Sequence, residues 1–265
     1  MKISIISDLE GVSGSVWGGY GLPLSGEAGY YTEMMTAEIN TVVRTLQDEG
    51  VEDIYLYEAH TVKPGVLPRN IRIGTAMDQL EGSAGLFFIG QHGPAGVRKA
   101  VFAHTMSSAT TFQMRLNGLV CGELTMCAAY AGVLGIPTVF VSGEYQTGRE
   151  ARNNLPGPCE FVCDEIGLSN HSAICRPLGH IERELAAKTK KALSHIGRTE
   201  PFDVGRVSLK IRKRYHGMGE KIAQLSFVKE QGDWLVIEAE DMVEAFHLYL
   251  VAAIGRDFWS FKLSK

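Results

Sequence analysis

The stretch Ile3-Ser4-Ile5-Ile6-Ser7-Asp8-Leu9-Glu10-Gly11 places two carboxylates directly after an apolar run. Such a run favours a buried strand of an α/β sheet. Side chains at i and i+2 of an extended chain point to the same side, so Asp8 and Glu10 project together. Two like charges repel each other, and burying either one unpaired is costly, so a bound divalent cation would stabilise the pair. Taken alone, such a stretch is more often a solvated turn whose acids contact only water.

Metal-binding side chains also follow several later apolar runs. The run 53–57 is followed by Glu58-Ala59-His60, the run 85–90 by Gln91-His92, the run 100–103 by His104, and the run 119–122 by Glu123, which begins a helical stretch. In an open α/β sheet the carboxyl ends of the strands meet at one edge, where ligands bind. Each histidine alone is more often a hydrogen-bonded structural residue, but histidines after three separate runs favour a common metal site with Asp8 and Glu10.

The chain resembles the D-aminopeptidase family of zinc metallopeptidases. The resemblance rests on Ser-Asp-x-Glu-Gly at 7–11, the strand-end His60, Gly-x-His at 90–92, His104 with Thr105, and Asn-Gly-x-x-x-Gly-Glu at 117–123. These motifs cover most of residues 1–145, and weaker similarity continues toward the C-terminus. The resemblance implies two zinc ions per chain, a catalytic residue that is not a ligand, His104, and five metal ligands: Asp8, Glu10, His60, His92 and Glu123.

Three positions depart from the family pattern. The family commonly has Asp where this chain has Glu58, an aromatic residue where it has Gln91, and Gly-Asp-Asp where it has Gly143-Glu144-Tyr145. These changes leave the expected ligands intact and concern substrate preference.

A site with carboxylate and imidazole ligands suits zinc, and also Mn²⁺, Co²⁺ or Fe²⁺. In one possible partition Asp8 bridges two ions, and the remaining ligands divide as Glu10 with His60 and His92 with Glu123. A water held between two cations loses a proton near neutral pH and can attack an amide carbonyl that one ion polarises.

Two further roles follow from amide hydrolysis. The leaving amine must be protonated and the developing oxyanion stabilised, and His104 is suited to either task. An aminopeptidase must also bind the free α-ammonium group of its substrate, for which Glu58, Glu144 or another nearby acid is a candidate.

The expected function is a dinuclear zinc aminopeptidase that hydrolyses short peptides through a metal-bridging water. The family resemblance implies N-terminal D-amino acids in the substrate and self-association into a ring-based homo-oligomer, a homodecamer. Two alternatives stay open: a two-metal phosphoesterase, and a non-catalytic metal-containing peptide-binding protein. Against the phosphoesterase, the nearest cations to the ligands, Arg98 and Arg115, belong to no phosphate-binding motif.

Composition is that of an ordinary globular enzyme. The 265 residues are 45% hydrophobic and 21% charged, and they allow one large and one small domain. A formal charge of −4 offers no general attraction to nucleic acid or an anionic membrane, and the basic run 210–214 reads as a strand end. No segment approaches the ~20 apolar residues of a membrane span, so a cytoplasmic location is expected. The five scattered cysteines fit reduced thiols.

The expected fold is a three-layer α/β/α arrangement with a central, mostly parallel sheet, plus a smaller C-terminal α+β lobe. We place the metal-binding catalytic domain at residues 1–200 and the lobe with its closing helix at 201–265. Apolar periodicity predicts helices at 27–47, 180–195, 219–225 and 242–254. Asn117-Gly118 and Gly232 predict hairpin turns, and the glycine-rich segment 11–26 predicts a functional flap.

Overall fold

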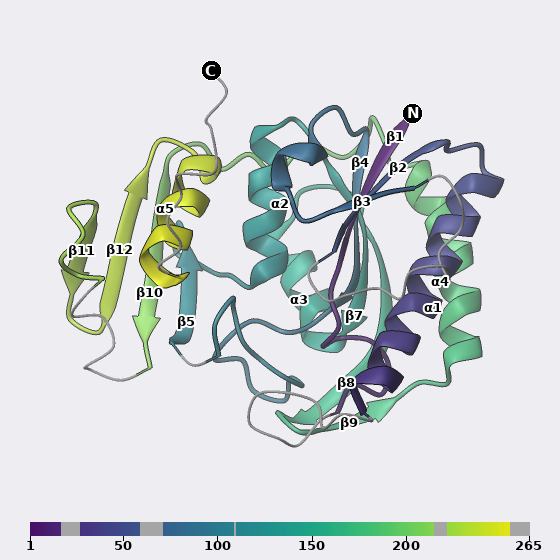
Figure 1. Ribbon diagram of the computed structural model, residues 1–265, viewed down its shortest axis with the longest axis horizontal. Coiled ribbons are helices and arrows are strands. Elements are labelled where there is room, and N and C mark those ends of the chain that lie inside the picture. Colours follow the sequence, from purple (N-terminus) through teal and green to yellow (C-terminus); the bar gives the residue numbers. More distant parts are fainter. Residues whose placement is uncertain (17–26, 59–70, 109, 215–221, 255–265) are drawn as a thin grey trace.

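The computed structural model describes residues 1–16, 27–58, 71–108, 110–214 and 222–254. Within these residues the chain forms two sheets (Figure 1). One has seven strands in the order β3-β2-β1-β4-β7-β8-β9, and the other has five in the order β11-β12-β10-β5-β6.

The seven-stranded sheet is the centre of the molecule. Its strands are β1 (Lys2–Ser7), β2 (Asp53–Glu58), β3 (Arg72–Gly74), β4 (Gly85–Gln91), β7 (Thr138–Glu144), β8 (Glu160–Ser169) and β9 (Ser172–Cys175). All neighbouring pairs are parallel except β8 and β9, which are antiparallel. Every residue of β4 and β7 is buried, which accounts for their unbroken apolar runs.

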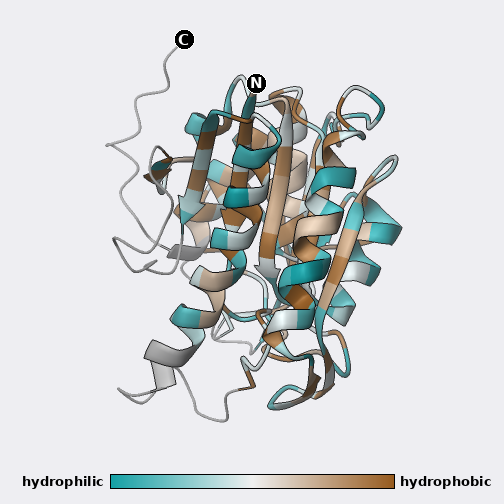
Figure 2. Ribbon diagram, turned by 90° about the vertical axis from the view of Figure 1, so that its right-hand side faces the viewer, coloured by the Kyte–Doolittle hydropathy of each residue, from teal (hydrophilic) through white to brown (hydrophobic). Residues whose placement is uncertain are grey.

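Helices cover both faces of this sheet. On one face lie α1 (Glu27–Asp48) and α4 (Leu178–Leu193), whose apolar side chains pack with those of β1 and β4. On the other face lie α2 (Glu123–Val133) and α3 (Tyr145–Asn154). Figure 2 shows mainly brown central strands beside helices that carry both brown and teal residues, as expected for helices with one buried side. The predicted mostly parallel α/β fold is confirmed.

The smaller sheet is antiparallel and consists of β5 (Thr111–Leu116), β6 (Leu119–Val120), β10 (Val207–Lys213), β11 (Val228–Gln231) and β12 (Trp234–Ala239). Helix α5 (Met242–Ile254) follows it, as predicted. Asn117 and Gly118 have φ values of 49° and 88°, the left-handed conformation of a tight hairpin turn. Because β5 and β6 come from residues 111–120, the sheet joins both sides of the expected boundary, and the division at residue 200 stays a prediction.

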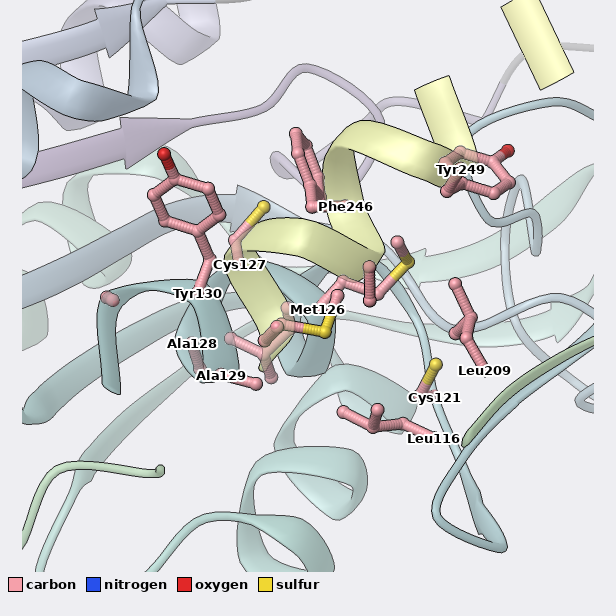
Figure 3. Packing of buried hydrophobic residues seen from close by; sticks show 14 of the residues in the cluster. Leu116, Cys121, Met126, Cys127, Ala128, Ala129, Tyr130, Leu209, Phe246 and Tyr249 are labelled. Carbon is pink, nitrogen blue, oxygen red and sulfur yellow. The ribbon is translucent and has the colours of Figure 1, made fainter. Parts of the chain in front are cut away.

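A hydrophobic cluster packs α2 between the central sheet and α5 (Figure 3). Tyr130 of α2 meets Phe246 of α5 edge to face, with 5.5 Å between ring centroids. Met126 and Tyr249 are completely buried in the same cluster. The position of α2, and of its first residue Glu123, is therefore fixed by packing on both sides.

Three predicted segments differ from the structure or lie partly outside the described residues. The prediction of a strand at 100–103 is wrong, because these residues lie in the turns between β4 and β5. Of the helix predicted at 219–225, residues 222–225 form a turn and the rest lie outside the described residues. Residues 17–26 of the predicted flap also lie outside them. A short 3₁₀ helix, η1 (Met77–Leu80), precedes β4.

The cysteines and the helices bear on the expectations from composition. The five cysteines form no disulfide. Among the described helices, none combines the length and apolar character needed to cross a membrane.

Candidate metal centre

The segment after β1 carries Asp8 and Glu10 along the end of β4. The Asp8 amide donates to the Ile89 carbonyl at 2.9 Å, and the Gly11 amide donates to that of Gly90 at 2.8 Å. A Cβ at Gly11 would lie only 2.0 Å from the Gln91 carbonyl oxygen, so a glycine is required for this close approach. The side chain of Asp8 is buried, and its Oδ1 accepts a hydrogen bond from the Leu9 amide at 2.8 Å.

His92 follows β4 and points its Nε2 toward two carboxylates. Its Nδ1 lies 3.0 Å from the Gly93 carbonyl oxygen, which can only accept, so Nδ1 carries the proton. Nε2 lies 3.4 Å from Asp8 Oδ2 and 3.4 Å from Glu123 Oε1. A histidine held by its Nδ1 proton with Nε2 free for a ligand is the usual arrangement at metal sites.

His104 lies in the turns between β4 and β5, stacked on His92. The two rings are 3.9 Å apart and inclined by only 6°. His104 Nδ1 lies 2.6 Å from the Phe102 carbonyl oxygen, and its Nε2 lies 3.5 Å from Glu123 Oε1. Phe102 and Met106 have φ values of 47° and 61°, a conformation that non-glycine residues rarely adopt. The backbone strain around His104 is of the kind that collects at functional sites.

Glu123 opens α2 and faces both histidines. Its Oε1 accepts a hydrogen bond from the Met106 amide at 2.7 Å, which links α2 to the segment carrying His104. Potential ligand atoms of His92, His104 and Glu123 all lie within 4.8 Å of one another. Three metal-binding side chains from separate parts of the chain thus meet at one point.

The electrostatics of the site couple these groups strongly. Burial alone would lower the pKa of His92, but the negative charges of Asp8, Glu123 and Glu10 outweigh it and raise the pKa to about 10. Burial alone would raise the pKa of Glu123, whereas hydrogen bonding to His92 and the charges of both histidines lower it to about 2. Burial and the neighbouring His92 charge lower the pKa of His104.

A metal ion fits this donor set. His92 Nε2 is fully buried and makes no well-directed hydrogen bond within the described part of the chain, although two carboxylates are near it. The charge of a cation would replace the proton that these carboxylates favour on His92. The nearby thiols suit the site less, because burial raises the pKa of both Cys121 and Cys127 and keeps them protonated.

The structure brings together most of the predicted site residues. Asp8, His92, His104 and Glu123 converge, and Glu10 is near enough for its negative charge to favour the protonated form of both histidines, although burial and His92 still lower the pKa of His104. His60 lies outside the described residues.

The two acids considered for binding the substrate ammonium group differ in position. Glu58 ends β2 beside Ser7 and is buried. Glu144 accepts hydrogen bonds from the backbone amides of Gln146 at 2.7 Å and Gly167 at 3.1 Å, so its carboxylate caps α3 and joins that helix to β8. Its two oxygens therefore already serve structural hydrogen bonds.

One buried acid next to the site, Glu150 of α3, was not predicted from the sequence. Its Oε1 accepts hydrogen bonds from the amide of Gly122 at 2.6 Å and the hydroxyl of Thr125 at 2.5 Å. Both partners flank Glu123 in the sequence. A carboxylate that caps a helix from another helix leaves no local pattern, and the absence of a capping side chain at Gly122 is the one signal the sequence holds.

Comparison with known proteins shows the family of this chain. The D-aminopeptidase profile, peptidase family M55, matches residues 1–251. The D-aminopeptidase of Bacillus subtilis (strain 168) is 23% identical over 275 residues, covering 95% of this chain and 96% of that protein. A solved structure of a zinc-dependent D-aminopeptidase from Bacillus subtilis, a self-compartmentalizing protease, shares the fold. The TM-score is 0.84 with 21% identity over 97% of this chain and 100% of that one. Since the family profile spans nearly the whole chain, this protein belongs to the D-aminopeptidase family of peptidases.

Proposed function

We propose that this protein is a dinuclear zinc aminopeptidase that removes N-terminal D-amino acids from short peptides. The observation that supports it most directly is the convergence of His92, His104 and Glu123, whose potential ligand atoms lie within 4.8 Å of one another. The proposed zinc ligands are Asp8, Glu10, His60, His92 and Glu123, and the proposed catalytic residue is His104.

The ligands and the catalytic histidine divide the chemistry between them. Zinc, when bound, supplies polarisation of the scissile carbonyl and activation of water. His104 is held through Nδ1 by the Phe102 carbonyl, so Nε2 is the atom that faces the site. We assign to this Nε2 the uptake of a proton from the attacking water and its transfer to the leaving amine. Burial of His92, at the centre of the cluster, limits competing contact with water.

An amide fits this site better than a phosphate ester. Of the two arginines nearest the ligands in the sequence, Arg115 donates to the Gly118 carbonyl at 2.9 Å and so stabilises the β5–β6 turn. A comparison of a generic phosphate ester with an aminoacyl amide on one zinc-loaded sample distinguishes the two functions. We expect cleavage of the amide alone, and turnover of the ester alone would favour the phosphoesterase.

Self-association is a further part of the proposal. The similar solved structure is a self-compartmentalizing protease, and this supports self-association of the present chain. Our proposal for the form of the assembly is a ring-based homo-oligomer, a decamer. Light scattering of the purified protein gives the particle mass directly, and a monomeric mass would contradict this part of the proposal.

Metal content tests the proposed centre. Protein purified without chelator should contain close to two zinc ions per chain, and dialysis against a chelator followed by zinc should remove and restore them. Protein that binds no zinc under either condition would rule the proposal out.

A further inference from the structure

We propose that Glu150 is a positioning residue that holds Glu123 in the metal centre by capping the first turn of α2. The inference rests on the proposed role of Glu123 as a zinc ligand. Glu150 acts from α3, through the residues on either side of Glu123 rather than on the metal itself.

The contacts of Glu150 all concentrate on one oxygen. Oε1 accepts from the Gly122 amide at 2.6 Å, the Thr125 hydroxyl at 2.5 Å and the Thr125 amide at 3.3 Å. Glu150 Oε2 has no hydrogen-bond partner within the described residues. Glu150 is buried, so these bonds are protected from competition with water.

Helix α2 needs a cap of this kind because its own N-cap residue is a glycine. A helix begins with amides that lack partners within the helix, and a Ser, Thr, Asp or Asn side chain normally binds them. Gly122 supplies none, and the first turn of α2 is buried beyond the reach of solvent, from Leu124 onward. The Glu150 carboxylate meets these amides instead, and its charge also suits the positive end of the helix.

Close packing around Gly122 leaves no room for a side chain there, which explains why the capping group comes from α3. A Cβ at Gly122 would lie 2.8 Å from Glu150 Oε2 and 3.0 Å from the Cβ of Pro94. A residue with its own capping side chain therefore cannot fit without moving Glu150. Pro94 follows His92 by two residues. The close packing of Gly122 and Pro94 therefore joins the start of α2 to the segment that carries His92.

A second side chain of α3 forms hydrogen bonds to the same region at the start of α2. Asn154 donates through Nδ2 to the Val120 carbonyl and to the Thr125 hydroxyl oxygen, both at 2.9 Å. Glu150 and Asn154 are four residues apart and so lie on one face of α3. Together they fix the chain on both sides of Glu123.

Zinc binding should be sensitive to this arrangement. Glu123 Oε1 lies 3.4 Å from His92 Nε2 and 3.5 Å from His104 Nε2, and small movements of the helix start would change both distances. Loss of residues that orient metal ligands typically weakens metal affinity by about 10–100-fold. The expected effect of Glu150 is therefore on zinc affinity and turnover, beyond any effect on folding.

The test compares Glu150→Ala with Glu150→Gln by titration of metal-free protein with zinc against a competing chelator. Ala removes every hydrogen bond, and we expect the zinc dissociation constant to rise by about 10–100-fold. Reconstituted Glu150→Ala should lose kcat with little change in KM. Gln keeps an oxygen at the Oε1 position and should restore zinc affinity close to that of the wild type.

Controls separate positioning from general stability. Leu185→Ala leaves a cavity under α4, on the opposite face of the sheet, and should lower the unfolding temperature without changing zinc affinity. If Glu150→Ala does not fold, Thr125→Val removes one donor to Glu150 and should weaken zinc binding in the same direction.

Two results would overturn the inference. One is wild-type zinc affinity in Glu150→Ala or Thr125→Val, and the other is a Gln variant as weak as the Ala variant, which would assign the effect to charge. Both presuppose that the wild type binds zinc. A wild-type protein that binds none would instead contradict the proposed function.

Discussion

His92 and His104 lie ring to ring, yet their surroundings assign them different tasks. His92 Nε2 is buried and lies 3.4 Å from both Asp8 Oδ2 and Glu123 Oε1, while His104 Nε2 lies 3.5 Å from Glu123 Oε1. A ligand needs neighbours that share the metal, whereas a proton-transfer group needs access to the substrate. His104 is the more exposed of the pair, with 19% of its side chain accessible against 1% for His92.

Alanine substitution should therefore separate the two histidines. His104→Ala should keep its zinc and lose turnover by about 10²–10⁴-fold, the range for a positioned acid-base group. His92→Ala should release at least one zinc and regain part of its activity at high zinc concentration. Metal analysis and kinetics on the same samples give the comparison. Zinc loss in His104→Ala with retention in His92→Ala would show that we have assigned the two roles the wrong way round.

Several residues of the candidate site were predictable from the sequence. Asp8, Glu10 and His92 follow strands of the parallel sheet, whose edge collects such positions. The expectation for Glu123 was right for a different reason, because this residue follows β6 of the antiparallel sheet and begins α2. Glu150 escapes prediction because its partners, Gly122 and Thr125, are far from it in the sequence.

At the scale of elements, the contact between the end of β4 and the segment after β1 supports the site. Gly11→Ala would place a Cβ 2.0 Å from the backbone carbonyl oxygen of Gln91. Because this clash is with the backbone, rotation of a side chain cannot relieve it. We expect a lower unfolding temperature and weaker zinc binding, because Asp8 and Glu10 precede Gly11 directly. Thermal unfolding with and without zinc measures both effects.

Gly179 provides the matched control. It lies in the first turn of α4, where an added Cβ would meet only the Arg183 guanidinium at 3.9 Å. Gly179→Ala should be neutral or stabilising, by up to about 1 kcal/mol from helix propensity. An unaltered Gly11→Ala protein would contradict the role given to this contact.

The helix with a clear apolar periodicity was predictable, whereas a short apolar run was predicted wrongly. The helix over 27–47 is confirmed as α1, and its end is followed by Gly50 with a φ of 81°. The run 100–103 has the apolar composition of a strand, but Phe102 adopts φ 47° and the chain turns. The Phe102 amide donates to the Asn170 carbonyl at 3.1 Å, and the Phe102 carbonyl oxygen lies 2.6 Å from His104 Nδ1. Such contacts form only in the folded protein, so apolar content alone cannot reveal them.

At the scale of the whole molecule, buried acids join layers that are distant in the sequence. Glu38 of α1 accepts from the Ser13 amide at 3.4 Å, and Glu165 of β8 accepts from the Gly14 amide at 3.1 Å. Asp164 lies beside them and is also completely buried. Burial is the main cause that raises the pKa of Glu38 and of Glu165 to about 8, and the neighbouring acids add to it.

These raised pKa values predict how stability depends on pH. The ordinary pKa of Glu is 4.5, so between 4.5 and about 8 the folded state holds protons that the unfolded state has released. The contribution to stability is therefore complete below about pH 4.5 and is lost as the pH rises toward 8.

Glu38→Gln should flatten this dependence. The amide mimics the protonated acid, so the variant should lose less stability than the wild type between pH 5 and about pH 8. Unfolding temperatures across this range, at fixed zinc, provide the measurement. Glu33→Gln on the exposed side of α1 is the control. Parallel curves for Glu38→Gln and the wild type would contradict the protonated state of this acid.

The most direct test of the whole account is cleavage of stereoisomeric dipeptides by one preparation in three states: as purified, after chelation, and after zinc is restored. We predict release of alanine from D-Ala-D-Ala, little release from L-Ala-L-Ala, loss of activity with the chelator and recovery with zinc. Cleavage that continues at full rate after the metal is removed, or preference for the L-peptide with zinc present, would contradict the account of this protein as a zinc-dependent D-aminopeptidase.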